Sequence, residues 1–278
     1  MALGKPYLMR PSTGWTRPKR TTRGVDVAGV VEKVGAGVTR FQVGDEVFGL
    51  GSGSFAEYVS ADETELVRKP ATLSFEEAAA LPVAGCTALE ALRRPGPFEP
   101  GRTVLVNGAA GGVGTFTVQL AKAWGATVTG VCSTAKVELV RSLGADYLVD
   151  YTKQDFCRTG ATYDLVIDAV GNRSFRDLRR AMSPSGQLVL VGGGGGPLLG
   201  PIRQMIRSKF VGPFVSQTIN VVMAKVNVDN LLELARLHEE GKLRAPIERT
   251  CSLPDTPAEV HRLYAGDARG KTVVLVNA

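Results

Sequence analysis

The sequence has few residues of the kind that bind transition metals. Among its 278 residues only two are histidines, at positions 238 and 261. The four cysteines are scattered and form no Cys-x-x-Cys pair: Cys86, Cys132, Cys157 and Cys251. Zinc sites are usually built from closely spaced Cys and His ligands. We therefore expect no metal site, and we interpret the cysteines as reduced thiols of an intracellular protein.

Long apolar runs are also missing. No hydrophobic stretch reaches the roughly 20 residues that a transmembrane helix needs. The composition, 44% hydrophobic and 22% charged, is typical of a globular protein. The length suits one large or two medium domains. We expect a cytoplasmic protein that does not associate with membranes.

The N-terminal segment lacks acidic residues. Before Asp26 there are six basic residues and no acid: Lys5, Arg10, Arg17, Lys19, Arg20 and Arg23. A solvated loop is the favoured interpretation, with a targeting presequence and an anion-steering segment as alternatives. Pro6, Pro11, Gly14 and Pro18 would break the helix of a presequence. We do not expect nucleic-acid binding, because few aromatic residues lie among the basic ones.

The first hundred residues have a β-rich pattern followed by two helical pieces. Short β-branched runs between Gly-rich turns predict strands over 27–34, 45–48 and 55–60. Ser74 and Glu77 form a capping box that opens a helix over 76–81. Pro82 interrupts this helix, and a second one is expected over 83–92. The Pro/Gly-rich stretch 95–101 marks a domain boundary.

From Thr103 onward strands and helices alternate. Apolar strands are expected at 103–107, 127–132, 146–149, 163–169, 186–191 and 209–215, with helices at 112–124, 135–143 and 174–182. This alternation predicts an α/β fold with a doubly wound parallel sheet. A helix over 228–240, a strand over 247–253, a helix opened by a second capping box at Thr256 and Glu259, and a strand over 272–276 complete the chain.

Four glycines follow the first of these strands: Gly108, Gly111, Gly112 and Gly114. A strand that turns sharply into a helix presents unpaired N–H groups and the positive end of the helix dipole to an anion. Glycines let the backbone approach a pyrophosphate closely. We therefore predict a dinucleotide site that includes these glycines with Asn107, Ala110 and Val113.

The end of the second strand distinguishes between the two nicotinamide dinucleotides. NAD-binding folds usually place an acid there to accept from the ribose 2′-hydroxyl. This sequence has Ser133, Thr134 and Lys136 instead. Hydroxyls and a cation suit a 2′-phosphate, so the pattern predicts NADPH. An ordinary solvated lysine at a helix start is the alternative for Lys136.

The other strand ends extend the predicted site. Tyr151 follows the third strand, where it either contacts the adenosine or simply packs. The fourth strand ends at Asp168, Val170 and Gly171, and the fifth at Gly192 and Gly193. Small residues there would let the ribose and nicotinamide lie against the backbone.

With these residues assembled, the sequence resembles the zinc-independent medium-chain dehydrogenase/reductase superfamily, and within it the quinone oxidoreductase group. The matching segments are 24–32 (GVDVAGVVE), 43–49 (VGDEVFG), 53–58 (GSFAEY), 79–82 (AALP), 87–88 (TA), 107–114 (NGAAGGVG) and 269–271 (RGK). The resemblance implies a Rossmann domain, residues 95–239, inserted into a GroES-like substrate domain of β-barrel type, residues 1–94 and 240–278. Family members have a longer N-terminal segment, so we expect the GroES-like domain to be incomplete at its start.

The resemblance also implies a function. It implies NADPH-dependent reduction of quinones or activated carbon–carbon double bonds, without zinc, because Gly24-Val-Asp26 stands where zinc-dependent relatives have Gly-His-Glu. A catalytically impaired NADPH-binding regulatory or interaction protein is the alternative.

The expected substrate-side residues come from the same resemblance and from donor chemistry. Thr87 resembles the family's nicotinamide-contacting threonine, with a plain helix position as the alternative. Tyr58 is a candidate donor to the substrate carbonyl, although a core position is favoured for it. Lys271 is expected to contact phosphate or substrate, or else to be an exposed lysine. The apolar segment 210–215 is expected at the sheet edge, where it would form a homodimer.

Overall fold

A computed structural model of the chain describes residues 22–191, 217–222, 224–266 and 269–276. Its contacts divide the described residues into two compact units. The first unit comprises residues 87–222, and the second comprises residues 22–86 and 224–276. The helix at Val228–Glu239 thus groups with the second unit, whereas the sequence interpretation placed it in the 95–239 domain.

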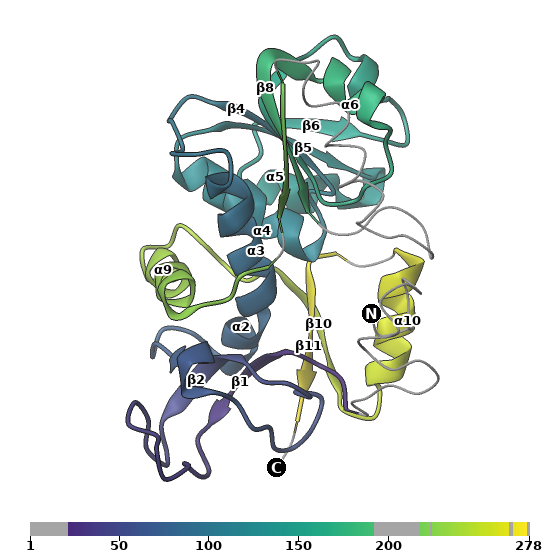
Figure 1. Ribbon diagram of the computed structural model, residues 1–278. Helices are drawn as coiled ribbons and strands as arrows, with labels where there is room; N and C mark the ends of the chain where they lie inside the picture. Colours follow the sequence, from purple (N-terminus) through teal and green to yellow (C-terminus); the bar gives the residue numbers. More distant parts are fainter. Residues whose placement is uncertain (1–21, 192–216, 223, 267–268, 277–278) are drawn as a thin grey trace, which may run out of the picture. The chain divides into compact units, whose positions relative to one another are not determined.

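The first unit contains a six-stranded parallel sheet in the order β6-β5-β4-β7-β8-β9 (Figure 1). Its strands are β4 (Thr103–Asn107), β5 (Thr127–Cys132), β6 (Tyr147–Asp150), β7 (Tyr163–Asp168), β8 (Met182–Val191) and β9 (Thr218–Val222). The chain moves outward from β4 to β6 and then returns to β7 beside β4. The predicted doubly wound sheet is therefore confirmed, with its topological switch point between β4 and β7.

Helix α3 (Pro82–Arg93) precedes β4. The connections between the strands contain α4 (Gly112–Ala123), α5 (Val137–Ser142) and α6 (Phe175–Arg180), with 3-10 turns η3 (Thr134–Lys136) and η4 (Phe156–Arg158). Helix α4 packs on β4 and β5, and its residues from Gly114 to Ala121 are all buried. The centres of β4 and β7 are fully buried as well. This burial on both faces explains why the strands read as unbroken apolar runs.

The second unit contains two small sheets. Strands β1 (Asp26–Val30), β2 (Glu46–Leu50) and β3 (Leu66–Arg68) form an antiparallel sheet, and η2 (Glu63–Glu65) precedes β3. Strands β10 (Ile247–Ser252) and β11 (Lys271–Leu275) pair in parallel. Helix α2 (Phe75–Ala80) contacts both sheets, α9 (Val228–Glu239) packs on β3, and α10 (Thr256–Ala265) packs on β10.

The predicted helix opening at Ser74 is confirmed. The Ser74 side chain accepts from the Glu77 N–H, and the Glu77 carboxylate accepts from the Ser74 N–H at 3.0 Å. The break at Pro82 is also confirmed, because α2 ends at Ala80 and α3 begins at Pro82. Asp26 supports this junction: its Oδ1 accepts from the Val83 N–H, and its Oδ2 lies 3.3 Å from Lys271 Nζ.

Two local predictions are wrong. Residues 55–60 form no strand; the Phe55 N–H bonds to the Arg23 carbonyl, but no ladder continues from it among the described residues. The first strand also ends at Val30 rather than at Val34, ahead of the turn that contains Gly35 and Gly37.

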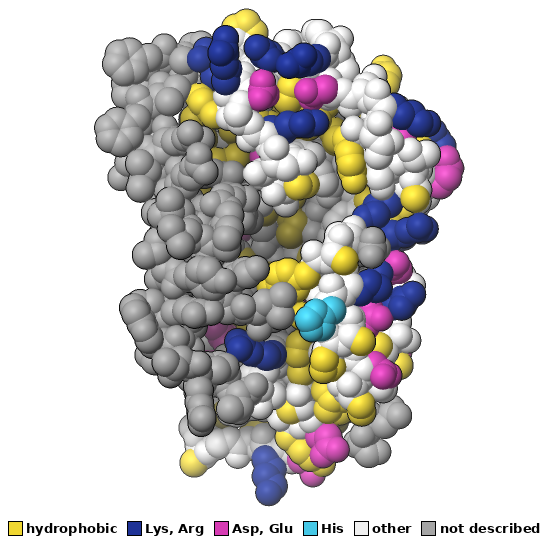
Figure 2. Space-filling view, turned by 90° about the vertical axis from the view of Figure 1, so that its right-hand side faces the viewer, with side chains coloured by type: hydrophobic (Ala, Val, Ile, Leu, Met, Phe, Trp, Pro, Cys, Tyr) yellow, Lys and Arg dark blue, Asp and Glu magenta, His cyan; other side chains and the backbone are white. Residues whose placement is uncertain are grey.

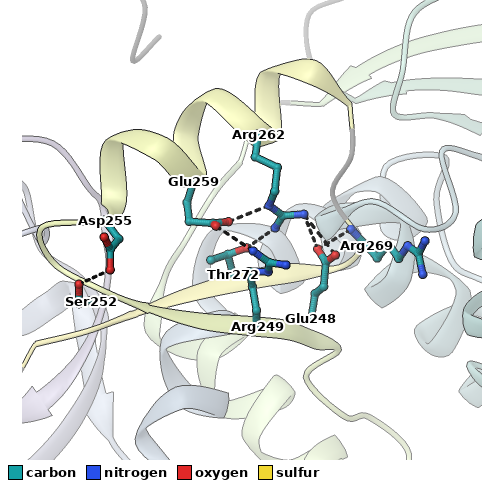
Figure 3. Close-up of polar contacts among 8 residues, drawn as sticks. All are labelled: Glu248, Arg249, Ser252, Asp255, Glu259, Arg262, Arg269 and Thr272. Carbon is teal, nitrogen blue, oxygen red and sulfur yellow. Dashed lines mark hydrogen bonds and ion pairs between the residues drawn. The ribbon is translucent and has the colours of Figure 1, made fainter.

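The second capping box, at Thr256 and Glu259, is wrong too. Asp255 is the N-cap of α10, and Thr256 is already helical. The Glu259 carboxylate instead accepts from Arg262 Nε at 2.8 Å and from Arg249 at 3.1 Å, and this bonding lowers its pKa (Figure 3). Arg262 also bonds to Glu248 and to the Thr272 hydroxyl, so one guanidinium joins α10 to β10 and β11. These ion pairs outcompete the helix terminus for the carboxylate.

Candidate functional site

The candidate site lies at the carboxyl ends of the parallel strands in the first unit. Strand β4 ends at Asn107, and Gly108 follows with φ +88°, a conformation that favours glycine. The Gly108 carbonyl accepts from the Gly111 N–H at 2.9 Å and so closes a tight turn into α4. Gly111 is the N-cap and provides no side chain to bond the first N–H groups of the helix. The predicted anion-binding geometry is therefore present.

The glycines also allow helix α4 to lie very close to the turn. A Cβ built on Gly114 would lie 2.1 Å from the Gly108 carbonyl oxygen, and one on Gly108 would lie 2.6 Å from a methyl group of Val170. Side chains at either position would push the helix or the neighbouring loop away. The spacing of these glycines thus reflects packing as much as ligand approach.

Asp168 ties the ends of β4 and β7 together. Its carboxylate is buried, and Oδ1 accepts from Asn107 Nδ2 at 2.9 Å and from the N–H groups of Val170 at 3.1 Å and Gly171 at 2.9 Å. Asn107 Nδ2 also lies 3.2 Å from Asn172 Oδ1. The other oxygen, Oδ2, is buried and has no hydrogen-bond partner among the described residues. A buried acceptor without a donor fits a ligand that brings its own hydroxyl group.

The adenosine side of the predicted site is more exposed. Ser133 and Lys136 bracket the 3-10 turn that follows β5, and the Ser133 side chain makes no capping bond. Tyr151 is 52% exposed, so it is not a core residue, and its N–H bonds to the Cys132 carbonyl. The carboxyl ends of β5 and β6 therefore lie side by side, because these two strands pair in parallel.

Asp150 is the residue that the sequence interpretation missed. It is the last residue of β6 and is paired in register with Cys132 of β5. Its carboxylate accepts a short hydrogen bond from the Thr134 hydroxyl and further bonds from the Thr152 hydroxyl and N–H. These bonds lower the pKa of Asp150 to about 2. An acid is therefore present beside Ser133 and Thr134 in space, although none is adjacent in sequence. Reading neighbouring strand ends together would have found it.

The remaining predicted residues are spread over both units. Thr87 is buried within α3 in the first unit. Tyr58 belongs to the second unit, in an irregular segment, and is 70% exposed, which contradicts the core position favoured for it. Lys271, at the start of β11, pairs with Asp26 and is mostly buried. Gly192, Gly193 and the predicted edge strand 210–215 lie outside the described residues; β6 and β9 are the two edge strands of the described sheet.

Burial keeps the thiols of Cys132 and Cys157 in their neutral form. None of the four cysteines forms a disulfide, and burial raises the pKa of Cys132 to about 11 and that of Cys157 to about 12. Within the described ranges, no group of three or more His, Cys, Asp or Glu side chains could hold a metal ion. None of the helices in those ranges is long and apolar enough to cross a membrane.

Charges of both signs share the surface. Figure 2 shows Lys and Arg side chains interspersed with Asp and Glu on the face it presents. Mixing of this kind is typical of an ordinary solvated surface.

Comparisons with known proteins agree with this architecture. The family model described as the alcohol dehydrogenase GroES-like domain matches residues 7–71, and that described as zinc-binding dehydrogenase matches residues 143–274. The quinone oxidoreductase from Coxiella burnetii superimposes with a TM-score of 0.82 at 30% identity, over 94% of this chain and 81% of that one. The Escherichia coli quinone oxidoreductase complexed with NADPH gives 0.81 at 24% identity, over 96% and 86%.

Two curated relatives show how much of each chain is similar. NAD(P)H oxidoreductase RTN4IP1 of Mus musculus is 35% identical over 284 residues, which span 92% of this chain and 70% of the relative. The 2-methylene-furan-3-one reductase of Solanum lycopersicum is 47% identical over 166 residues, which span 55% of this chain and 42% of the relative. The chain therefore spans less than half of the tomato reductase and about two thirds of the mouse protein.

The fold and the family-model match define a protein with a Rossmann-type sheet and a GroES-like domain. More narrowly, the chain belongs to the medium-chain dehydrogenase/reductase superfamily, in its quinone oxidoreductase-like group. The predicted family and fold class are both confirmed.

Proposed function

We propose that the chain is an NADPH-dependent oxidoreductase that reduces quinones or α,β-unsaturated carbonyl compounds without zinc. The observation that carries the proposal is the convergence of four strand ends on the open N-terminus of α4, at the switch point between β4 and β7. The names of the tomato reductase and of the Coxiella and Escherichia coli quinone oxidoreductases support the reaction class.

The cofactor site would be formed by the residues described above. The first N–H groups of α4, at Gly112, Val113 and Gly114, would hold the pyrophosphate, with Ala110 and Gly111 shaping the turn. Asp168 and Asn107 fix the loop of Val170 and Gly171, so that its backbone can support the nicotinamide riboside. Ser133, Thr134, Lys136 and Tyr151 would face the adenosine. NADPH supplies the hydride when it is bound.

The substrate side depends on donors rather than on an acid–base pair. Negative charge develops on the carbonyl oxygen as the β-carbon accepts hydride, so a hydrogen-bond donor must face that oxygen. Thr87 is our candidate for orienting the nicotinamide and Tyr58 for donating to the substrate. The exposure of Tyr58 leaves its hydroxyl accessible to a substrate. Lys271 is already bonded to Asp26, so we assign it first to holding β11 against the start of α3.

Four further parts of the proposal rest on the sequence. Zinc independence is supported by Val25 and Asp26, which stand where zinc-dependent relatives have a His-Glu pair. We propose two domains, one formed by residues 1–94 and 240–278 and the other by residues 95–239. The contacts of α9 group this helix with the first of these domains. We also propose a homodimer formed by residues 210–215, and a cytoplasmic location, although the mouse relative is named as mitochondrial.

Turnover is the direct test. The purified chain is mixed with NADPH and a panel of quinones and enones, and the absorbance of NADPH at 340 nm is followed. We expect oxidation of NADPH that depends on an acceptor from one of these classes. Binding of NADPH without any turnover would instead favour the alternative of a catalytically impaired NADPH-binding protein. Failure to bind NADPH or NADH would refute both.

A further inference from the structure

The acid at the end of β6 changes what the adenosine side of the site can recognise. Asp150 lies beside Cys132 in the sheet, and its carboxylate contacts the hydroxyls of Thr134 and Thr152. The sequence interpretation treated Thr134 as a donor to a 2′-phosphate, because no acid was visible nearby in sequence.

Each threonine hydroxyl has one proton to donate. Asp150 is ionised at neutral pH, because the bonds from Thr134 and Thr152 lower its pKa to about 2, so it can only accept. The Thr134 hydroxyl donates to Oδ2, and the Thr152 hydroxyl donates to Oδ1 at 2.7 Å. The Thr152 N–H adds a third bond to Oδ1 at 3.0 Å. The two hydroxyl oxygens also lie 3.1 Å apart, where either could donate to the other. Both hydroxyl protons are therefore engaged within this group of three residues, and the hydroxyl oxygens can offer only lone pairs to a ligand.

This pattern suits a ribose hydroxyl better than a phosphate. A 2′-hydroxyl can donate to the free lone pair of Thr134, whereas a 2′-phosphate dianion needs donors there. A phosphate oxygen within hydrogen-bond distance of Thr134 would also lie within about 6 Å of the Asp150 carboxylate, two hydrogen-bond lengths away. Lys153 Nζ, 3.7 Å from Asp150, offsets part of that negative charge, but its side chain is 69% exposed and is well solvated.

We propose that Asp150 is a specificity-determining residue that limits the preference of this site for NADPH over NADH, by engaging the Thr134 hydroxyl and by repelling the 2′-phosphate. The proposal rests on the dinucleotide site proposed above. In this proposal, the remaining preference for NADPH comes from Ser133, Lys136 and Tyr151. NADH is therefore a usable cofactor, and Asp150→Asn strengthens the discrimination in favour of NADPH.

The test compares the dissociation constants of NADPH and NADH, measured by titration calorimetry, for the wild type and Asp150→Asn. The asparagine keeps the shape of the side chain, removes its charge and leaves it with one acceptor oxygen, so one threonine hydroxyl is released. We expect Asp150→Asn to tighten NADPH binding about tenfold. NADH binding should change by less than about twofold, or weaken.

Asp146→Asn is the matched control. Asp146 directly precedes β6 at the opposite end of the same strand, where it pairs with Lys122 at 2.8 Å. This variant makes the same change in net charge and should leave the ratio of the two dissociation constants unchanged. Circular dichroism confirms that each variant is folded.

The outcomes separate this proposal from the function on which it rests. An unchanged ratio in Asp150→Asn, or an equal shift in Asp146→Asn, would overturn the role of Asp150 while leaving the dinucleotide site intact. If the wild type bound neither dinucleotide, the proposed function itself would fail.

Discussion

Two aspartates end strands of the same sheet that β5 and β4 separate, and they differ in burial and in their hydrogen-bond partners. Asp168 ends β7 at the switch point; it is 1% exposed, and its Oδ1 accepts three N–H bonds. Asp150 ends the edge strand β6, its side chain is 12% exposed, and it bonds to two threonine hydroxyls and one N–H. The fully buried carboxylate shapes the backbone, whereas the partly exposed one sets the charge and donor pattern that a ligand meets. Position at a strand end therefore does not by itself assign a role.

The largest expected effect is on the free energy of unfolding and concerns Asp168, the buried aspartate. Asp168→Ala removes the acceptor for Asn107 Nδ2 and for the N–H groups of Val170 and Gly171, and leaves these donors unpaired. We expect the free energy of unfolding in urea to fall by about 3 kcal/mol. Asp168→Asn, which keeps Oδ1 as an acceptor, should lose about 1 kcal/mol. Equal losses in both variants would show that charge, and not the three bonds, matters.

The next prediction tests whether close packing against α4 requires glycine in the turn that follows β4. A Cβ at position 114 would lie 2.1 Å from the Gly108 carbonyl oxygen, whereas one at position 111 would lie 3.3 Å from the same atom. Gly114→Ala should therefore reduce the free energy of unfolding by about 2–3 kcal/mol, and Gly111→Ala by less than about 1 kcal/mol. Similar values for the two variants would contradict the close approach of α4 to the turn.

The smallest effect concerns Asp150 and is a difference in the pH dependence of stability below about pH 4. The pKa of Asp150 is lowered from 3.8 to about 2 by its bonds to Thr134 and Thr152. A carboxyl whose pKa is lowered on folding stabilises the folded state above its unfolded pKa, and this contribution is lost as the pH falls from about 4 to about 2. Asp150→Asn should therefore show a shallower loss of melting temperature across that interval. Identical acid profiles would argue against these bonds.

Much of this architecture can be predicted from the sequence, because the pattern of apolar runs depends on burial that the sheet itself imposes. The strands at 103–107 and 127–132 match β4 and β5 in both bounds. The capping box at Ser74 was found because its two bonds are local. The pattern at Thr256 looks the same in sequence, yet Arg249 and Arg262 compete for Glu259 from other elements.

The site was predicted less completely, for a similar reason. The glycine turn is local and could be read directly. The contact between Thr134 and Asp150 joins residues 16 apart in sequence, and that between Asn107 and Asp168 joins residues 61 apart. Both depend on which strands are neighbours. The strand over 55–60 failed because a strand requires a partner, which the local sequence does not specify.

The central claim is that the ends of β4 to β7 form a dinucleotide site. A crystal structure of the chain with NADPH tests it most directly. We predict electron density for the pyrophosphate at the N–H groups of Gly112–Gly114, with the adenosine lying against Ser133, Tyr151 and Asp150. Density for the dinucleotide away from the N-terminus of α4, or its absence at saturating NADPH, would contradict the claim.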